Sequence, residues 1–378
     1  MTAQADTVPP SPRIGLRQRL IRLVADPAFQ ARAARVPFLR RLVRAEGEAM
    51  FDLVAGFCHS QVLLALVRLD LPAQLLDSPA DTATLAARSR VPADRMVVLL
   101  NAAASLGLLR RRRDLWSLTT RGAALAGVPG LQGMIAHHDV LYRDLTDPVA
   151  FFRGEVETEL AAFWPYVFGA TGATDPGVTA TYSALMADSQ LLVAADTIAA
   201  VDWSASRRVL DVGGGTGAFL TALGQAQPHL TLDLFDLPAV APGAAARFAA
   251  AGLTARASIH PGSFRDGPLP QGADTITLVR VLYDHADDTV LALLRVVRSA
   301  LPPGGRLIVS EPMTGGDRPR RAGDAYFALY CMAMRTGRAR SAARIAELLR
   351  QADFAVPHRQ PRPARPFVTT VITAVNPD

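Results

Sequence analysis

The two halves of the chain differ in the period of their hydrophobic positions. Up to about residue 130, apolar residues recur at helical spacing, which predicts amphipathic helices. From Arg207 onward, short apolar runs alternate with helical segments, the pattern of βαβ units and a parallel sheet. We therefore predict an α/β fold, a doubly wound domain preceded by an α-helical one, with strands at 207–212, 230–235, 256–261, 275–281, 306–311 and 367–375.

The helical half contains a predicted winged-helix-like unit. Asp81 is placed to cap a helix, Pro92 to begin the next, and residues 106–122 predict two short strands around a charged turn. The four arginines at 110–113 suggest DNA binding, but the second helix presents mainly apolar side chains where a recognition helix needs donors and acceptors. We expect subunit packing and no nucleic-acid partner, with a ligand-sensing regulator as the alternative.

The N-terminal residues combine positive charge with apolar side chains. Residues 1–12 are polar and proline-rich and predict a disordered arm. From Arg13 to about Arg44, arginine alternates with apolar residues, which predicts a pair of basic amphipathic helices. Residues 1–50 carry nine arginines and four acidic residues, a net +5 of the chain's +6. A solvated helical face and contact with an anionic membrane surface both fit this pattern. No uninterrupted apolar run approaches the roughly 18 residues of a membrane span, and no signal peptide is evident, so we expect a cytoplasmic protein.

Composition excludes several kinds of chemistry. All 40 basic residues are arginine, and without lysine neither a Schiff base nor a Walker A nucleotide loop is possible. Cys58 and Cys331 are far apart, with no CxxC motif and no histidine at metal-ligand spacing. We expect no metal and no disulfide framework. The 378 residues, half of them hydrophobic, are enough for two globular domains.

A glycine-rich loop follows the first predicted strand, in the sequence VLDVGGGTG at 209–217. Gly213 and Gly215 also fit a dinucleotide-binding pattern, so the residues around the loop decide its ligand. Asp211 would repel a pyrophosphate but suits the ammonium group of a cofactor that carries an amino acid. Asp236 ends the second strand, where a carboxylate accepts hydrogen bonds from both ribose hydroxyls.

These motifs, with the turn and strand LPPGGRLIVSEP at 301–312, resemble class I S-adenosylmethionine-dependent methyltransferases. With the winged half, the chain resembles dimeric O-methyltransferases of the caffeate and hydroxyindole type. The resemblance implies a basic arm at 1–45, a winged-helix-like dimerisation domain at 46–175, a Rossmann-like methyltransferase domain at 176–378, and a homodimer. It implies S-adenosyl-L-methionine as cofactor, bound by Asp211, Gly213, Gly215, Asp236, Leu237, Ser263, Phe264 and Arg280.

A narrower resemblance concerns the acceptor. The segments FDLVAGF at 51–57, LYRDLTDPVAFFRGE at 141–155, FWPYVFGAT at 163–171 and RVLYDHADD at 280–288 resemble the hydroxycarotenoid-methylating branch of this family in purple phototrophic bacteria. That branch implies an apolar hydroxylated substrate, the 1-hydroxyl of an acyclic carotenoid, and peripheral contact with the photosynthetic membrane. A phenol or a polyketide is the alternative acceptor.

The family's general base is replaced in this chain. Relatives carry a His-Asp-Trp triplet with histidine as the base, and the match places Tyr283 at the histidine and His285 at the tryptophan. A tyrosine is neutral near pH 7, so we expect His285 to be the base, oriented by Glu311, with His138 as the alternative. The acidic residues beside them, Asp284, Asp287 and Asp288, are interpreted as helix N-terminal caps and partners of the helix dipole, with a role as catalytic acids as the alternative.

Aromatic residues gather between residues 137 and 182 and fit either a core between helices or the wall of an apolar pocket. Neighbouring helical residues diverge by about 100°, so we expect only one of His137 and His138 to face a site. The predicted substrate-binding residues are His138, Phe151, Trp164, Phe168 and Met186.

Overall fold

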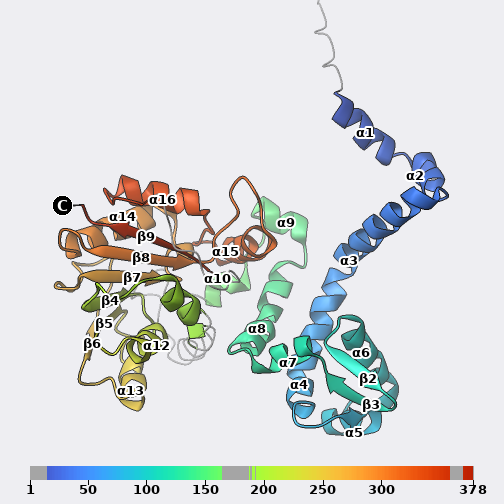
Figure 1. Ribbon diagram of the computed structural model, residues 1–378, viewed down its shortest axis with the longest axis horizontal. Helices are drawn as coiled ribbons and strands as arrows, with labels where there is room; N and C mark the ends of the chain where they lie inside the picture. The colour runs from blue at the N-terminus through green and yellow to red at the C-terminus, as the bar shows by residue number, and fades with distance from the viewer. Residues whose placement is uncertain (1–14, 164–186, 188–189, 192, 358–368, 378) are drawn as a thin grey trace, which may run out of the picture.

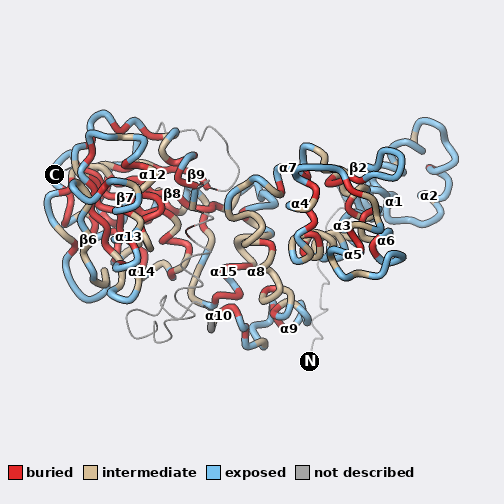
Figure 2. The backbone as a smooth tube through the Cα atoms, turned by 90° about the horizontal axis from the view of Figure 1, so that it is seen from below, coloured by how far each residue is buried: buried red, intermediate tan, exposed pale blue. Residues whose placement is uncertain are grey.

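The computed structural model describes residues 15–163, 187, 190–191, 193–357 and 369–377. Figure 1 shows a helical lobe that contains three short strands, an α/β lobe built on a six-stranded sheet, and a group of helices between them. Buried segments concentrate in the two lobes and in the helices that join them, whereas residues 15–54 are mostly exposed (Figure 2). The expected disordered arm, 1–12, lies outside the described residues.

Three helices begin the described chain: α1 (Leu16–Val24), α2 (Pro27–Ala33) and α3 (Pro37–Arg68). No residue of α1 is buried, and α1 and α2 extend away from the rest of the molecule beyond the start of α3 (Figure 1). Asp26 caps α2 by accepting a hydrogen bond from Ala28 N at 2.7 Å. The expected basic helices are therefore present, and the described residues leave them largely uncovered.

Helix α3 is long and apolar enough, by length and composition, to cross a membrane. An 18-residue window in it has a mean hydropathy of 1.7, and 11% of that window is buried. The expectation concerned uninterrupted apolar runs, whereas this helix qualifies by its average hydropathy. The sequence criterion required an uninterrupted apolar run, and single polar residues such as Asp52 and His59 interrupt this one without lowering its average much.

The helical lobe has the predicted order of helix, helix and wing. Its elements are α4 (Leu71–Gln74), β1 (Ala80–Asp81), α5 (Thr82–Ser89), α6 (Ala93–Ser105), β2 (Leu109–Arg112), β3 (Leu115–Leu118) and α7 (Thr120–Gly127). The strands pair antiparallel in the order β1-β3-β2. Asp81 caps α5 through Thr84 N at 2.7 Å, as its position predicts. Trp116 on β3 is 1% exposed and donates from Nε1 to Thr82 Oγ1 at 2.9 Å, which anchors the wing to α5.

The joining helices come from distant parts of the chain: α8 (Leu131–Asp144), α9 (Pro148–Arg153), α10 (Glu159–Phe163), the π-helix η3 (Arg321–Phe327) and α15 (Ala328–Met334). Buried side chains from α8, α9, α10 and α15 form one hydrophobic cluster. Thr158 Oγ1 donates to Ala333 O at 2.6 Å within it. A segment that precedes the first strand of the sheet thus packs against a segment that lies between its last two strands.

The α/β lobe contains β4 (Arg208–Val212), β5 (Thr231–Asp236), β6 (Ala257–Pro261), β7 (Thr275–Val279), β8 (Arg306–Glu311) and β9 (Thr370–Val375). The order is β6-β5-β4-β7-β8-β9, parallel except for β9. One core cluster joins the sheet to α12 (Ala218–Ala226) and α13 (Gly243–Ala250), and another joins it to α14 (Asp287–Ala300) and α16 (Ala342–Gln351). The doubly wound prediction is confirmed. The strand order reverses at β4, and ligands of such sheets bind at the carboxyl ends of the strands beside the reversal.

We predict that Trp116→Ala destabilises the helical lobe by about 3–5 kcal/mol, because it leaves a cavity and an unpaired Thr82 hydroxyl. Denaturant unfolding measures the change. Leu115→Ala, on the same strand but 46% exposed, is the control and should change stability by no more than about 0.5 kcal/mol. Equal losses in the two variants would contradict the anchoring role of Trp116.

Candidate active site

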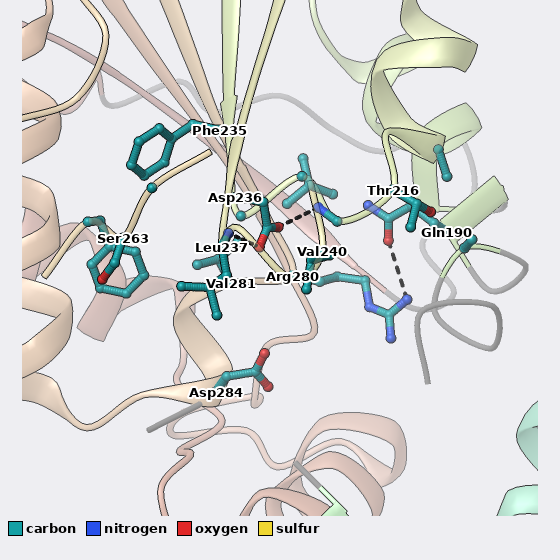
Figure 3. A pocket seen from close by; sticks show the side chains of 18 of the residues that line it. Gln190, Thr216, Phe235, Asp236, Leu237, Val240, Ser263, Arg280, Val281 and Asp284 are labelled. Atoms are coloured by element: carbon teal, nitrogen blue, oxygen red, sulfur yellow. Dashed lines mark hydrogen bonds between the residues drawn. The ribbon is translucent and has the colours of Figure 1, made fainter. Parts of the chain in front are cut away.

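A cavity opens at the carboxyl ends of β4, β5 and β7, where the strand order reverses (Figure 3). It is lined by segments that follow these strands and the neighbouring β6, together with two residues from a turn before α14: 213–216, 235–237, 262–265, 279–281, Asp284 and His285. Most of the predicted cofactor-binding residues are therefore brought to one place.

The glycine-rich loop lets backbone approach the cavity closely. Gly213 has φ +72°, and a Cβ there would lie 2.8 Å from Val281 Cγ2. Gly215 has φ +60°, lines the cavity, and has no atom within 4 Å of the position of a Cβ. A side chain at Gly215 would therefore occupy ligand space, and one at Gly213 would displace Val281.

Asp236 ends β5 beside this loop. Its Oδ2 accepts a hydrogen bond from Gly215 N and its Oδ1 accepts one from Leu237 N, both at 2.6 Å (Figure 3). Burial raises the pKa of Asp236 to about 6. Each carboxylate oxygen keeps a lone pair for a further donor, so the group suits a ligand with two adjacent hydroxyls.

Asp211 lies elsewhere than predicted. It is 1% exposed, beneath Gly214 and outside the cavity lining, and its Oδ1 accepts from Thr277 Oγ1 at 2.6 Å. Burial raises the pKa of Asp211 to about 7. In this structure Asp211 supports the loop from below and does not face a ligand's ammonium group.

Arg280 adopts a left-handed conformation, φ +60°, which is rare for residues other than glycine. This conformation ends β7 two residues earlier than predicted and turns the following segment toward the cavity. Arg280 N donates to Ser310 O at 2.8 Å, and its Nη1 donates to Gln190 Oε1 at 3.3 Å. Arg280 thus lines the cavity, as do Leu237, Ser263 and Phe264.

Glu311 holds the start of the turn that follows Arg280. Its Oε1 accepts from Val281 N at 2.8 Å and Leu282 N at 2.7 Å, and its Oε2 accepts from Tyr283 N at 3.3 Å. Burial raises the pKa of Glu311 to about 7. The expectation that Glu311 orients the His285 imidazole is therefore corrected, because both of its oxygens bind backbone.

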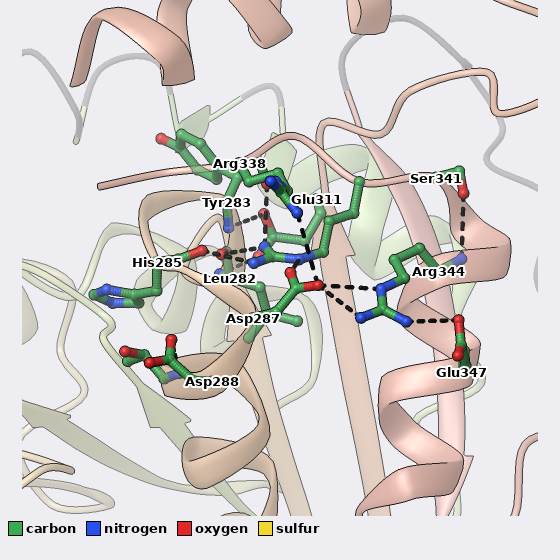
Figure 4. A network of polar contacts seen from close by, with 12 residues as sticks. Leu282, Tyr283, His285, Asp287, Asp288, Glu311, Arg338, Ser341, Arg344 and Glu347 are labelled. Carbon is green, nitrogen blue, oxygen red and sulfur yellow. Dashed lines mark hydrogen bonds and ion pairs between the residues drawn. The ribbon is translucent and has the colours of Figure 1, made fainter. Parts of the chain in front are cut away.

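Arg340 binds the backbone at the other end of the same turn. Figure 4 shows the turn residues Leu282, His285 and Asp287 with Arg344 beside Asp287. Arg340 is 3% exposed and donates to Leu282 O at 2.8 Å, to His285 O at 2.7 Å and to Asp287 Oδ1 at 2.7 Å. Arg344 binds the other oxygen of Asp287 at 2.7 Å. Asp287 is thus an ion-pair partner in the first turn of α14, and its arginines tie that turn to α16.

Tyr283 and His285, on either side of Asp284 in the turn, have different surroundings. Tyr283 is 4% exposed and lies outside the cavity lining, and burial raises its pKa far above the ordinary value. His285 lines the cavity with its Nδ1 3.5 Å from Arg265 Nη2, and burial together with Arg265 and Arg340 lowers its pKa to about 4. His285 is therefore a neutral and weak base at neutral pH.

Asp284 was missed as a site residue. It lines the cavity, and its buried Oδ1 has no hydrogen-bond partner. The cap interpretation does not hold for it, since Ala286 is the N-cap of α14 and no side chain caps that helix. Its place at the middle of the family triplet was the available signal.

The predicted substrate-binding residues fall into two groups. Trp164, Phe168 and Met186 lie outside the described residues. Phe151 is 4% exposed in the cluster between the lobes and does not line the cavity, so the core interpretation holds for it. His138 Nε2 lies 2.7 Å from Tyr326 Oη, and His137 Nε2 lies 3.1 Å from Tyr330 Oη, so a tyrosine holds each histidine.

Comparison with known proteins identifies this arrangement. The model of the O-methyltransferase domain matches residues 142–355, more than half of the chain, and that of the O-methyltransferase dimerisation domain matches residues 51–127. The chain belongs to the O-methyltransferase family. The protein is therefore an S-adenosylmethionine-dependent enzyme and not a ligand-sensing regulator. The dimerisation domain supports a homodimer.

Individual relatives agree with this O-methyltransferase assignment. The demethylspheroidene O-methyltransferase of Cereibacter sphaeroides is 56% identical over 365 residues, 96% of each chain. That of Rhodobacter capsulatus is 52% identical over 362 residues, 96% of this chain and 88% of the other. The crystal structure of human N-acetylserotonin methyltransferase with SAM shares the fold, with a TM-score of 0.72 and 24% identity over 87% of this chain and 97% of the human one.

The exposed apolar side chains of α3 fit a chain that dimerises. Those within the matched dimerisation domain include Phe51, Leu53, Val54 and Phe57, each more than 60% exposed in the single chain. An apolar face of this size is typical of a subunit interface. A second copy of this O-methyltransferase therefore suits the apolar window of α3.

We predict that Asp236→Asn weakens S-adenosylmethionine binding at least about tenfold, because an amide replaces a charged acceptor and disturbs the Gly215 hydrogen bond. Calorimetric titration with the cofactor measures the change. Asp288→Asn is the control: Asp288 is exposed and binds only Thr289 N among the described contacts. Unchanged affinity in the Asp236 variant would place the cofactor elsewhere.

Proposed function

We propose that this enzyme methylates the 1-hydroxyl of an acyclic hydroxycarotenoid of the demethylspheroidene type. The observation that carries the proposal is the identity of 56% and 52% to two demethylspheroidene O-methyltransferases across 96% of the chain. The cavity at the carboxyl end of the sheet supports it by providing a site for the methyl donor.

The donor fits the residues of the cavity. S-adenosylmethionine supplies an electrophilic methyl group on a sulfonium. Asp236 would hold the ribose hydroxyls, Gly213 and Gly215 would admit the donor close to backbone, and Leu237 would pack beside Asp236. The other lining residues expected to contact the donor are Ser263, Phe264 and Arg280.

The acceptor alcohol determines what else the protein must do. A tertiary alcohol is far less acidic than a phenol and arrives with its proton, so the enzyme must position the hydroxyl, exclude water and accept that proton. The transfer itself is an in-line displacement in which the sulfonium charge disappears. These requirements call for an apolar acceptor site beside a proton acceptor.

A direct assay tests the proposed acceptor. The purified enzyme is incubated with methyl-labelled S-adenosylmethionine and a panel of a 1-hydroxycarotenoid, a flavonoid and an anthracycline. We expect label only in the carotenoid, as a methyl ether that resists alkaline hydrolysis. Transfer to the phenolic or polyketide acceptors and none to the carotenoid would replace this proposal by the alternative.

We further propose that the cytoplasmic enzyme contacts an anionic membrane surface through residues 15–44. This segment has eight arginines and one acidic residue, and Arg17, Arg19 and Arg22 alternate with exposed apolar side chains on α1. The described structure leaves α1 without a buried residue. A basic amphipathic helix of this kind binds anionic lipid in the plane of the membrane, where a carotenoid resides.

Vesicle sedimentation tests this contact. Replacing Arg17, Arg19 and Arg22 together by glutamine should weaken binding to phosphatidylglycerol vesicles about tenfold or more at low salt, with cofactor affinity unchanged. The matched control replaces the exposed Arg95, Arg112 and Arg113 of the helical lobe in the same way. Equal sedimentation of both triple variants and the wild type, or equal binding to neutral vesicles, would overturn the membrane contact.

A further inference from the structure

One carboxylate in the wall of the cavity has a buried oxygen without a hydrogen-bond partner among the described residues. Asp284 ends the short 3₁₀ helix η2 (Leu282–Asp284), between β7 and α14. Figure 3 shows its carboxylate directed into the pocket that the glycine-rich loop also lines. Its Oδ1 is shielded from solvent and makes no hydrogen bond with any described residue.

An unpaired buried oxygen is costly and calls for an explanation. Among the described residues with such a side-chain oxygen, Asp284 is the one that lines the cavity. The turn around Asp284 is nevertheless firmly held. Glu311 binds the three preceding backbone N–H groups, and Arg340 binds the carbonyls of Leu282 and His285. Two buried charged side chains, Glu311 and Arg340, thus position the turn, while Asp284 Oδ1 remains available to accept a hydrogen bond.

The neighbouring candidates are less suited to accept a proton. Tyr283 lies outside the cavity lining, and Glu311 is occupied by backbone. His285 does line the cavity, but the cations of Arg265 and Arg340 oppose its protonation. Among the described residues of this turn, Asp284 alone combines a place in the cavity wall with an oxygen that has no partner.

We propose that Asp284 is a catalytic residue of the methyl transfer and that its Oδ1 accepts the hydrogen bond, and then the proton, of the acceptor hydroxyl. The hydroxyl oxygen forms the new bond to the methyl carbon with its own electron pair. The carbon–sulfur bond breaks with its pair remaining on sulfur, and the proton passes to the Asp284 carboxylate. This role deepens the proposed function, because it rests on an acceptor that arrives with its proton.

Asp284 must be ionised to act in this way. Burial and the nearby Glu311 raise its pKa well above the ordinary value, and Arg280 opposes them. Burial and the charge of Asp284 both raise the pKa values of Tyr283, Tyr330 and Cys331. A cationic donor in the same cavity adds an opposite charge and favours the carboxylate. By linkage, raising the pH should then strengthen binding of the cationic donor more than binding of its neutral product.

The first test compares turnover. We expect Asp284→Asn to lower kcat by about 10²–10⁴-fold with the hydroxycarotenoid, and Asp284→Glu to recover part of the loss. His285→Gln should cost less than Asp284→Asn, and Asp288→Asn should behave as wild type. Near-normal kcat in Asp284→Asn, a change in KM alone, or a larger loss in His285→Gln would overturn the proposal.

The second test needs no acceptor and also reports whether the variant is folded. Calorimetry gives the affinities of the full-length protein for S-adenosylmethionine and S-adenosylhomocysteine from about pH 6 to about pH 9. In the wild type, the ratio of the two affinities should rise about tenfold or more with pH, because the sulfonium and the Asp284 carboxylate attract each other. Asp284→Asn should flatten this rise while still binding S-adenosylhomocysteine.

The titrating groups Asp211, Asp236 and Glu311 remain in the variant, so the difference from wild type isolates Asp284. An unchanged pH dependence in Asp284→Asn would overturn the role of Asp284. Failure of the wild type to methylate the carotenoid would instead overturn the proposed acceptor and leave the affinity comparison valid.

Discussion

The site depends on one buried carboxylate that binds backbone. Glu311, at the end of β8, accepts hydrogen bonds from three successive N–H groups at 281–283. Those groups have no strand to pair with once Arg280 has turned the chain out of β7 in a left-handed conformation. An unpaired buried N–H is costly, and Glu311 removes this cost by accepting hydrogen bonds from all three groups. Glu311 thereby fixes the turn and determines which side chains of the turn reach the cavity.

At the same turn, an arginine makes contacts that a lysine could not make. Arg340 contacts two backbone carbonyls and one carboxylate at once, which requires a planar group with several donors in fixed directions. Lysine, which this chain lacks, has a single donor centre and would satisfy fewer of these acceptors. The ion pairs of Asp287 with Arg340 and Arg344 connect α14 to α16, so helices on one face of the sheet stabilise the turn at its edge.

Hydrogen bonds between histidines and tyrosines hold together the helices that join the two lobes. His137 and His138 on α8 each contact a tyrosine from the segment of η3 and α15, and burial lowers the pKa of both histidines. Neutral imidazoles pair with neutral phenols at little electrostatic cost, which suits a largely buried setting. The helices that join the lobes are therefore held by hydrogen bonds as well as by packing.

The sequence by itself determined the positions of the strands and of the glycine-rich loop. Strand positions follow from local apolar runs, and the loop follows from glycines whose positive φ and close neighbours exclude other residues, so β4, β5 and Gly213–Gly215 were predictable from a few adjacent residues. Asp236 was predictable because the end of a strand places its last side chain at the edge of the sheet.

Only the tertiary structure decided which acidic side chains face the cavity. Asp211 turned out to lie under Gly214, Glu311 to bind backbone about thirty residues away, and Asp284 to point inward in place of Tyr283. The reason is that these outcomes depend on one left-handed residue, Arg280, and on contacts between segments far apart in the chain. No local pattern records such contacts, because the same side chains with a different turn would face the opposite way.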